Sequence, residues 1–387
     1  MYFTATWCGP CQRIKPLIQA LSDGLDDEKV EKFSFRDSKK TTITVDALEQ
    51  KEYQITSVNS QKRNRNPYAP FTTSTLQQSA STNLKVSPRD VMSTAQKLYE
   101  AGLITYMRTD GIEMAPEGIT SARKQISSSL GKDFLPEKPR VFKNKAKNAQ
   151  EAHECIRPTD FSKTPENAKN LNKSELDLYA LIWKRALASQ AKAAEVLQTT
   201  VLISSLCDSA QFRLSGQVVT FEGHLKILQD MKKEDDDKRI PDIREESKMK
   251  LEKIYKEQHF TEQPPRFNEA SLIKRLEEEG IGRPSTYASI ISKIQERNYV
   301  KKEKNRLVPE DTGRLLNFFL EAYFNKYIEY NYTAKLEENL DDISSGEKHW
   351  KDVIKGFWEE LSQSVEYAMS FTTVSYTHLT LPTIYSV

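Results

Sequence analysis

The sequence predicts a multidomain α+β protein: a β-rich domain in two halves, a helical domain between the halves, and a second, mainly helical domain after them. Three observations predict this arrangement. Strand-like alternation occurs before about residue 66 and resumes near residue 196, helical patterns fill the interval, and helical patterns return from about residue 255. With 387 residues, the chain is long enough for two or three domains with cores of their own.

The strand patterns lie in two separated stretches. The first runs from about residue 34 to 60 and includes Tyr53–Thr56, and the second contains Thr200–Ile203, Phe212–Leu214 and Val218–Phe221. The economical arrangement inserts a helical domain into one β-rich domain that forms an arch. We therefore assign residues 34–66 and 193–252 to the β-rich arch, 67–192 to the inserted helical domain, 253–373 to the second helical domain and 374–387 to an unstructured tail.

The clearest helix of the inserted domain begins at Ser87. Ser87 is a good N-cap, Pro88 suits the first helical position, and Gly102 ends the helix. Its apolar face is formed by Val91, Ala95, Leu98 and Tyr99.

The second helical domain carries three recognisable elements. An apolar stripe at helical spacing comprises Tyr287, Ile290, Ile291 and Ile294. A basic hairpin is expected at Tyr299–Val308, and a further helix with buried Leu and Phe residues at Thr312–Tyr323.

Composition excludes several classes of protein. Hydrophobic residues make up 37% and charged residues 29% of the chain, and no apolar run approaches the roughly 18 residues of a membrane helix. Four cysteines do not form a disulfide scaffold and fit a reducing cytoplasm. The net charge of +2 identifies no partner by itself, because local clusters of charge matter more than totals.

The segment 1–33 contains Trp7, Cys8 and Cys11 in a pattern that resembles the redox centre of a thioredoxin, with a helix expected from Gln12 to Leu21. A helix start lowers the pKa of the first cysteine thiol in such a motif. We interpret the segment as a fragment of a domain; a working redox site at Cys8 and Cys11 is the alternative. A zinc site would need a further pair of Cys or His ligands.

A second group of reactive side chains follows Gly102. In an extended segment, Tyr106, Arg108 and Asp110 share one side, because side chains alternate at period two. A tyrosine hydroxyl, with an ordinary pKa near 10, needs nearby positive charge to become a nucleophile. A guanidinium can hold two phosphate oxygens as charge grows in a transition state. The alternative is a core tyrosine beside a surface arginine.

Four motifs in the same order are similar to those of the bacterial type IA DNA topoisomerases, over about residues 40 to 372. They are Ala69–Gln78 (APFTTSTLQQ), Ala95–Asp110 (AQKLYEAGLITYMRTD), Ala152–Pro158 (AHECIRP) and Gly280–Ser289 (GIGRPSTYAS). The resemblance implies that Tyr106 attacks one DNA strand and becomes joined to its 5′ phosphate, with Arg108 steadying the phosphate.

The resemblance also implies roles for residues outside this pair. His153 would hydrogen-bond a phosphate, Gln96 and Glu100 would face the site from their helix, and Thr105 would contact DNA. Arg283, Ser285 and Thr286 would form an anion pocket where a helix begins, with ordinary helix capping as the alternative or additional role. Arg297 and the basic hairpin would follow single-stranded DNA, whereas Arg157 and Asp110 could each bind DNA or form a structural ion pair.

The family further implies part of a ring around DNA, a monomer in the bacterial nucleoid, and Mg²⁺ held by an acidic α/β domain. Neither that domain nor the zinc modules of the family is recognisable in this sequence, so we expect poor relaxation of supercoiled DNA. The acidic runs Asp26–Asp27 and Glu234–Asp237 are interpreted as solvated loops, and we predict no metal ligands. No GxxxxGK[ST] loop occurs, which fits a transesterification that needs no ATP.

Two other functional classes remain open at this point. One is a module that binds single-stranded DNA without reacting, and the other is a thioredoxin-like oxidoreductase that uses Cys8 and Cys11.

Overall fold

The computed structural model describes residues 2–3, 17–21, 37–143, 154–207, 210–228, 240, 243–255, 260 and 263–375. The chain divides into two compact units. The first comprises residues 1–68, 123–140 and 187–264, and the second 69–122, 141–186 and 265–387.

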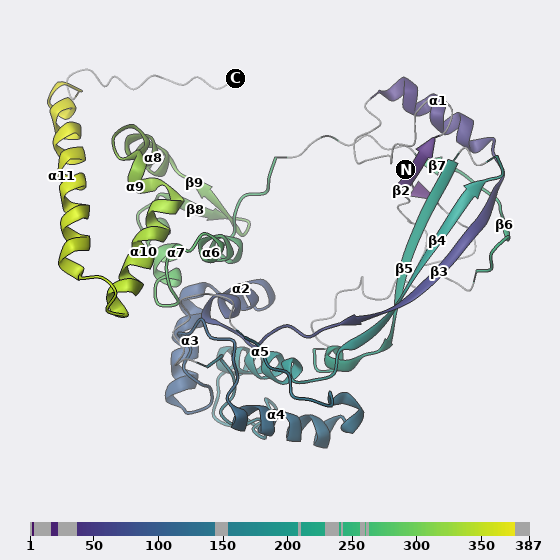
Figure 1. The fold of residues 1–387 in the computed structure, drawn as a ribbon, viewed down its shortest axis with the longest axis horizontal. Coiled ribbons are helices and arrows are strands. Elements are labelled where there is room, and N and C mark those ends of the chain that lie inside the picture. The colour runs from purple at the N-terminus through teal and green to yellow at the C-terminus, as the bar shows by residue number, and fades with distance from the viewer. Residues whose placement is uncertain are drawn as a thin grey trace. The chain divides into compact units, whose positions relative to one another are not determined.

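The first unit is built on an antiparallel sheet with the strand order β2-β5-β4-β3-β6. Its long strands are β3 (Tyr53–Arg65), β4 (Ala194–Ser205) and β5 (Ala210–Phe221), seen in Figure 1 as three neighbouring twisted ribbons. The shorter elements of this unit are β1 (Tyr2–Phe3), β2 (Leu17–Leu21), α1 (Ser38–Glu49), η1 (Lys132–Phe134), η2 (Gly223–Lys226), β6 (Lys248–Met249) and β7 (Ile254–Tyr255).

Strands β3 and β4 pair from Tyr53↔Ser205 to Arg65↔Ala194, although 128 residues lie between them in the sequence. The intervening chain holds the helices α2 to α5, so the order of elements agrees with the predicted insertion. A register shift between Ile55 and Ser57 marks a β-bulge in β3. Beyond the bulge, the residues of β3 that face the core are offset by one position.

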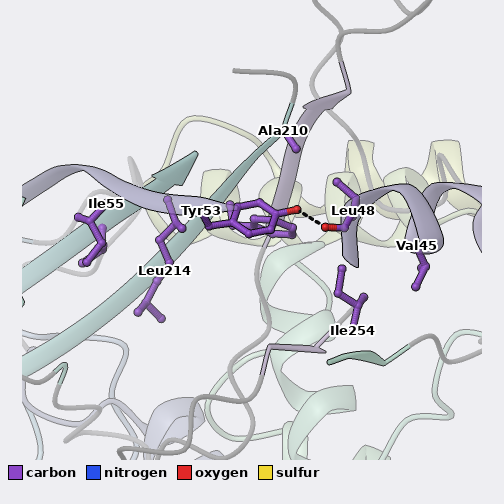
Figure 2. Packing of buried hydrophobic residues seen from close by; sticks show 10 residues of the cluster. Val45, Leu48, Tyr53, Ile55, Ala210, Leu214 and Ile254 are labelled. Carbon is purple, nitrogen blue, oxygen red and sulfur yellow. Dashed lines mark hydrogen bonds between the residues drawn. The ribbon is translucent and has the colours of Figure 1, made fainter. Parts of the chain in front are cut away.

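The core of the first unit forms between α1 and one face of the sheet. Val45 and Leu48 of α1 form one cluster with buried residues of four strands, β3, β4, β5 and β7, among them Tyr53, Ile55 and Leu214 (Figure 2). The Tyr53 hydroxyl donates a 2.8 Å hydrogen bond to the Leu48 carbonyl oxygen, drawn as the dashed line in Figure 2. This bond ties the C-terminal end of α1 to the start of β3.

Two expectations about the first unit were wrong. Residues 38–49 form α1 rather than strands, because Asp37 caps the helix by accepting from the Lys40 amide, and Val45 and Leu48 share its buried face. The β-branched run Thr41–Val45 favoured a strand, and packing overrode that local preference. Leu17–Leu21 is strand β2, paired with the edge of β5, and not the end of a helix.

The second unit is mainly helical. Its elements are α2 (Thr73–Asn83), α3 (Pro88–Glu100), α6 (Glu269–Glu278), α7 (Tyr287–Glu296), β8 (Val300–Glu303), β9 (Arg306–Pro309), α8 (Asp311–Tyr323), α9 (Asn325–Ile328), α10 (Tyr330–Ser344) and α11 (Trp350–Ser375). Helices α4 (Pro116–Ser129) and α5 (Lys173–Ser189) each contribute residues to both units.

Helix α2 packs on α6, and α3 packs on α7. The two helical stretches that the sequence assigned to separate domains therefore belong to one unit, whereas residues 123–140 group with the sheet. The hairpin β8–β9 forms as predicted, with Lys304 and Asn305 at positive φ in its turn. Helix α8 also forms, but its Leu315 and Phe318 are exposed rather than buried.

Helix α11 continues through Ser375, two residues into the predicted tail, and the rest of that tail lies outside the described residues. None of the helices within the described ranges is long and apolar enough to cross a lipid bilayer.

Replacing Tyr53 with phenylalanine tests the link between α1 and β3. Burial raises the pKa of Tyr53 to about 12, and the charge of Cys207 adds to that rise. We expect Tyr53→Phe to lower the free energy of unfolding by about 1 kcal/mol at neutral pH, the value of one buried hydrogen bond. Urea unfolding followed by circular dichroism measures this.

The same variant has a pH signature. Because the folded-state pKa of Tyr53 lies above the unfolded value of 10.0, its contribution is fully present below pH 10 and is lost as the pH rises toward 12. The stability of the wild-type chain should therefore fall more steeply than that of Tyr53→Phe between these pH values. Parallel curves for the two proteins would contradict the buried position of this hydroxyl.

Candidate active site

The segment Leu103–Gly111 follows α3 and carries Tyr106. Ser87 caps α3 by accepting from the Asp90 amide, and Gly102, at φ +65°, reverses the chain after the helix ends. Exposure then alternates: Ile104, Met107 and Thr109 are buried, whereas Tyr106, Arg108 and Asp110 are exposed. The alternation that the sequence predicted for these three side chains is confirmed.

Thr105 joins this segment to the chain at 155–157. Its amide donates to the Arg157 carbonyl oxygen at 2.9 Å, and its hydroxyl donates to the Cys155 carbonyl oxygen at 2.8 Å. The Arg157 amide donates back to the Thr105 hydroxyl oxygen at 3.0 Å. Thr105 thus holds the backbone beside Tyr106 through hydrogen bonds to residues 155 and 157, a role that the sequence did not predict.

Thr73, the first residue of α2, holds the segment on the other side of Tyr106. The fully buried Thr73 hydroxyl donates to the Met107 carbonyl oxygen at 2.8 Å and accepts from the Thr109 amide at 2.8 Å. The Thr73 amide donates to the Thr109 carbonyl oxygen at 2.9 Å. Hydrogen bonds at positions 105, 107 and 109 therefore fix the backbone of this segment. The side chains between these positions, Tyr106 and Arg108, are exposed to solvent.

Tyr99 is a neighbour of Tyr106 that the sequence placed on the buried face of α3. Its side chain is 41% exposed, and its ring meets the Tyr106 ring edge to face at 5.4 Å between centroids. The only sequence signal was its position at the edge of the apolar stripe. On the same exposed side of α3, the Gln96 amide donates to the Glu100 carboxylate at 2.8 Å, so these two predicted residues lie together.

Arg157 is held in a buried ion pair. Its guanidinium donates to both oxygens of the Glu154 carboxylate at 2.9 and 3.0 Å, and only 5% of its side chain is exposed. A Cβ on Gly118 would lie 2.7 Å from the Arg157 Nε atom, so α4 approaches the guanidinium at a residue that has no side chain. Of the two roles left open for Arg157, these contacts describe the structural ion pair.

Arg283 precedes α7 and faces carboxylates of α10. Its guanidinium lies 2.6 Å from Asp341 and 3.7 Å from Glu337. The Thr286 hydroxyl accepts from the Arg283 amide at 2.8 Å, while Ser285 is exposed. Thr286 makes no side-chain bond to the first turn of α7, so ordinary side-chain capping does not account for this residue.

Tyr287 is a buried tyrosine at the start of α7, four residues after Arg283. Burial raises the pKa of Tyr287 to about 12, with the carboxylates of Glu277, Glu337 and Asp110 adding to the rise and Arg283 opposing it. Asp110 and Arg283, predicted as site residues from distant motifs, are thus two of the charges that influence the pKa of this buried phenol. The Ser74 hydroxyl also donates to Glu277 at 2.7 Å, which fixes α2 on α6.

The lysines of the β8–β9 hairpin are partly neutralised. Lys302 lies 2.6 Å from the buried Glu269, and Lys301 lies 3.0 Å from both Glu303 and Glu310. Arg297, at the end of α7, is exposed. Contact of Arg297 and the hairpin with DNA stays a prediction.

Three predicted site residues, His153, Cys8 and Cys11, lie outside the described residues. Within the described ranges, no group of three or more His, Cys, Asp or Glu side chains is arranged to hold a metal ion. The residues described therefore do not fit a Mg²⁺ site.

Comparison with known proteins gives consistent results. A profile of the DNA topoisomerase family matches residues 12–355, so the similarity begins within the segment first assigned to a thioredoxin-like fragment. DNA topoisomerase 1 of Rickettsia felis is 42% identical over 356 residues, which cover 88% of this chain and 46% of the relative. DNA topoisomerase 1 of Zymomonas mobilis is 43% identical, with 88% of this chain and 28% of the relative covered.

Among solved structures, full-length topoisomerase I from Thermotoga maritima superposes with a TM-score of 0.76 at 31% identity, over 87% of this chain and 55% of that one. The chain spans less than half of the length of the two curated relatives.

Thr73→Val tests the anchoring of the Tyr106 segment. The substitution keeps the shape of the side chain but leaves the Met107 carbonyl and the Thr109 amide without their buried partner. We expect the free energy of unfolding to fall by about 2–3 kcal/mol. Thr82→Val is the matched control, since the exposed Thr82 hydroxyl bonds only within α2, to the Gln78 carbonyl. Equal effects of the two substitutions in urea unfolding would contradict the anchoring role.

Proposed function

The chain belongs to the bacterial type IA DNA topoisomerases, and on that premise we propose that it cleaves one strand of DNA through the phenolic oxygen of Tyr106. The observation that supports this most is an exposed tyrosine on a backbone segment fixed at positions 105, 107 and 109. A fixed backbone holds the nucleophile near an attacking geometry, which lowers the entropic part of the barrier.

The proposed step is a transesterification. The Tyr106 oxygen attacks the phosphorus of a phosphodiester, a bond forms between that oxygen and phosphorus, and the bond from phosphorus to the 3′ oxygen breaks. The phenolic proton is lost and the 3′ oxygen gains a proton, so the products are a 5′-phosphotyrosine and a free 3′ hydroxyl. The number of phosphodiester-type bonds is unchanged, so the reverse reaction reseals the strand without ATP.

Arg108 is the cation proposed for the scissile phosphate. It shares the exposed side of the segment with Tyr106, and a guanidinium can donate two hydrogen bonds to phosphate oxygens as negative charge grows. Gln96, Glu100 and Tyr99 extend this surface along α3. Single-stranded DNA is the proposed substrate, as the family resemblance implies.

Relaxation of negatively supercoiled DNA by strand passage and religation is the activity proposed for the complete enzyme. Mg²⁺ is proposed as a cofactor of that complete enzyme, as the family resemblance implies. We also propose that the protein acts as a monomer on DNA in the bacterial cytoplasm.

Trapping on a single-stranded oligonucleotide tests the nucleophile. Incubation followed by denaturation in SDS should leave a fraction of the wild-type chain joined to labelled DNA. Tyr106→Phe should lose that adduct entirely, since no other oxygen occupies the position. Tyr68→Phe, which alters a tyrosine that is 69% exposed elsewhere, should keep it.

Two outcomes would contradict the proposal. An adduct that survives in Tyr106→Phe would place the reaction on another residue. A wild-type chain that binds the oligonucleotide but forms no adduct at any DNA length or temperature would make it a non-catalytic DNA-binding module.

The ion pair between Arg283 and Asp341 yields a second test. If Arg283 binds a DNA phosphate, the Asp341 carboxylate competes for the guanidinium, so Asp341→Asn should tighten binding of single-stranded DNA. We expect the slope of log K against log salt to steepen by about 0.7, the value for one added phosphate contact on a single strand.

Asp342→Asn is the control for this experiment. Asp342 is adjacent on α10 but pairs with Lys348 at 2.8 Å instead of Arg283. Fluorescence anisotropy at several salt concentrations measures both variants. A slope for Asp341→Asn that equals that of Asp342→Asn would exclude Arg283 from DNA contact.

A further inference from the structure

Tyr99 lies on the last turn of α3, where the end of the helix holds its backbone. Ala95 and Leu98, on the inner face of α3, are fully buried, so the helix is anchored in the second unit. The Gly102 amide donates to the Tyr99 carbonyl oxygen at 2.8 Å, and the Leu103 amide donates to the Leu98 carbonyl oxygen at 3.0 Å. The backbone that carries the Tyr99 ring is therefore fixed.

The ring of Tyr99 contacts the ring of Tyr106. Their centroids lie 5.4 Å apart and their planes meet at 68°, which is one of the arrangements that aromatic pairs prefer. Each of the two side chains is 41% exposed. The contact spans the turn at Gly102 and joins the end of α3 to the segment Leu103–Gly111.

A fixed backbone does not by itself fix the phenol of Tyr106. Hydrogen bonds at positions 105, 107 and 109 restrain the main chain, whereas an exposed side chain can occupy three staggered χ1 wells. A change of well moves the phenolic oxygen by several ångströms, and a misplacement of about 1 Å can cost about a hundredfold in rate. A contact made by the ring itself is therefore needed to favour one orientation of the phenol over the others.

Tyr99 is suited to provide this contact because it belongs to a helix. Aromatic side chains in helices are restricted to two χ1 wells, so the Tyr99 ring has less freedom than a ring on an extended segment. The core beneath α3 is formed by Val91, Ala95 and Leu98, so the exposed ring of Tyr99 is not needed to close it. Its contact with Tyr106 can thus be removed without opening the core.

From these observations we propose that Tyr99 is a positioning residue, whose ring holds the phenol of Tyr106 in the orientation from which its oxygen attacks the phosphodiester. The inference rests on the proposed function, because it takes Tyr106 as the nucleophile. It assigns to Tyr99 neither a contact with the reacting atoms nor a proton to transfer. The ring of Tyr99 acts, and its hydroxyl does not.

Three substitutions in the full chain test this role. Tyr99→Leu removes the ring, and Tyr99→Phe keeps the ring but removes the hydroxyl. Tyr330→Leu is the control, since Tyr330 belongs to the same unit and is 59% exposed at the start of α10. For each variant we would measure the rate of adduct formation on a saturating single-stranded oligonucleotide, the Kd for that oligonucleotide and the midpoint of urea unfolding.

We expect Tyr99→Leu to slow adduct formation at saturation by about 2- to 12-fold, the factor equivalent to the roughly 0.5–1.5 kcal/mol of one aromatic pair. Its Kd and its unfolding midpoint should stay close to those of the wild type, because the lost ring is exposed and contacts the nucleophile. Tyr99→Phe should keep the wild-type rate, and so should Tyr330→Leu.

The ring contact also has a readout that does not depend on cleavage. NMR of the chain with labelled tyrosine rings should show nuclear Overhauser effects between Tyr99 and Tyr106, with the signals assigned from their loss in Tyr99→Phe and Tyr106→Phe. In Tyr99→Leu the ring protons of Tyr106 should shift, because the ring current of Tyr99 is removed. A wild-type chain that forms no adduct would contradict the proposed function, while these spectra would still test the contact between the rings.

Four results would overturn the proposal. One is a Tyr99→Leu variant that forms the adduct as fast as the wild type, and another is a Tyr99→Phe variant that is as slow as Tyr99→Leu. The third is a loss that appears in Kd and not in the rate at saturation, which would make Tyr99 a stacking platform for a DNA base. The fourth is the absence of nuclear Overhauser effects between the two rings in the wild type.

Discussion

The hydroxyl of Thr73 is the interaction on which the rest of the site depends. It bonds the Met107 carbonyl and the Thr109 amide at once, at 2.8 Å each, from a fully buried position. A nucleophile has to be exposed to its substrate, and exposed side chains on loops are usually mobile. Here the buried alternate residues carry the hydrogen bonds, so the exposed side chain of Tyr106 stands on backbone that is fixed on both sides.

Charge pairing is the second constraint on the site. Arg157 is buried and bound through two hydrogen bonds to Glu154, and breaking such a pair leaves an uncompensated charge. The pair of Arg283 and Asp341 is about one-third exposed on each side, so solvent screens it. The two arginines therefore differ in burial: Arg157 holds the chain at 154–157 in place from a buried position, whereas Arg283 lies in a partly exposed ion pair.

Capping residues and the alternation of side chains predicted those parts of the fold that depend on neighbouring residues in the sequence. Helix α3 was predictable because Ser87, Pro88 and Gly102 mark its ends, and the exposure of Tyr106 and Arg108 followed from their period-two spacing. Helix α1 and strand β2 were missed, since each depends on packing or pairing with distant parts of the sheet.

The same limit applied to the site. Motif spacing identified Tyr106 and Arg283 as site residues. It could not show that the Tyr99 ring contacts the Tyr106 ring or that the Glu154 carboxylate forms an ion pair with Arg157. Nor could it show that Asp341 of α10 forms an ion pair with Arg283. Hydrogen exchange of individual amides, measured by NMR, tests the central claim most directly. The account predicts that the amides of Thr105 and Thr109 are protected to the same degree as interior amides of α2, despite lying in a loop. Exchange of both amides at the rate of an open loop would show that the segment bearing Tyr106 is not held, and would contradict the account.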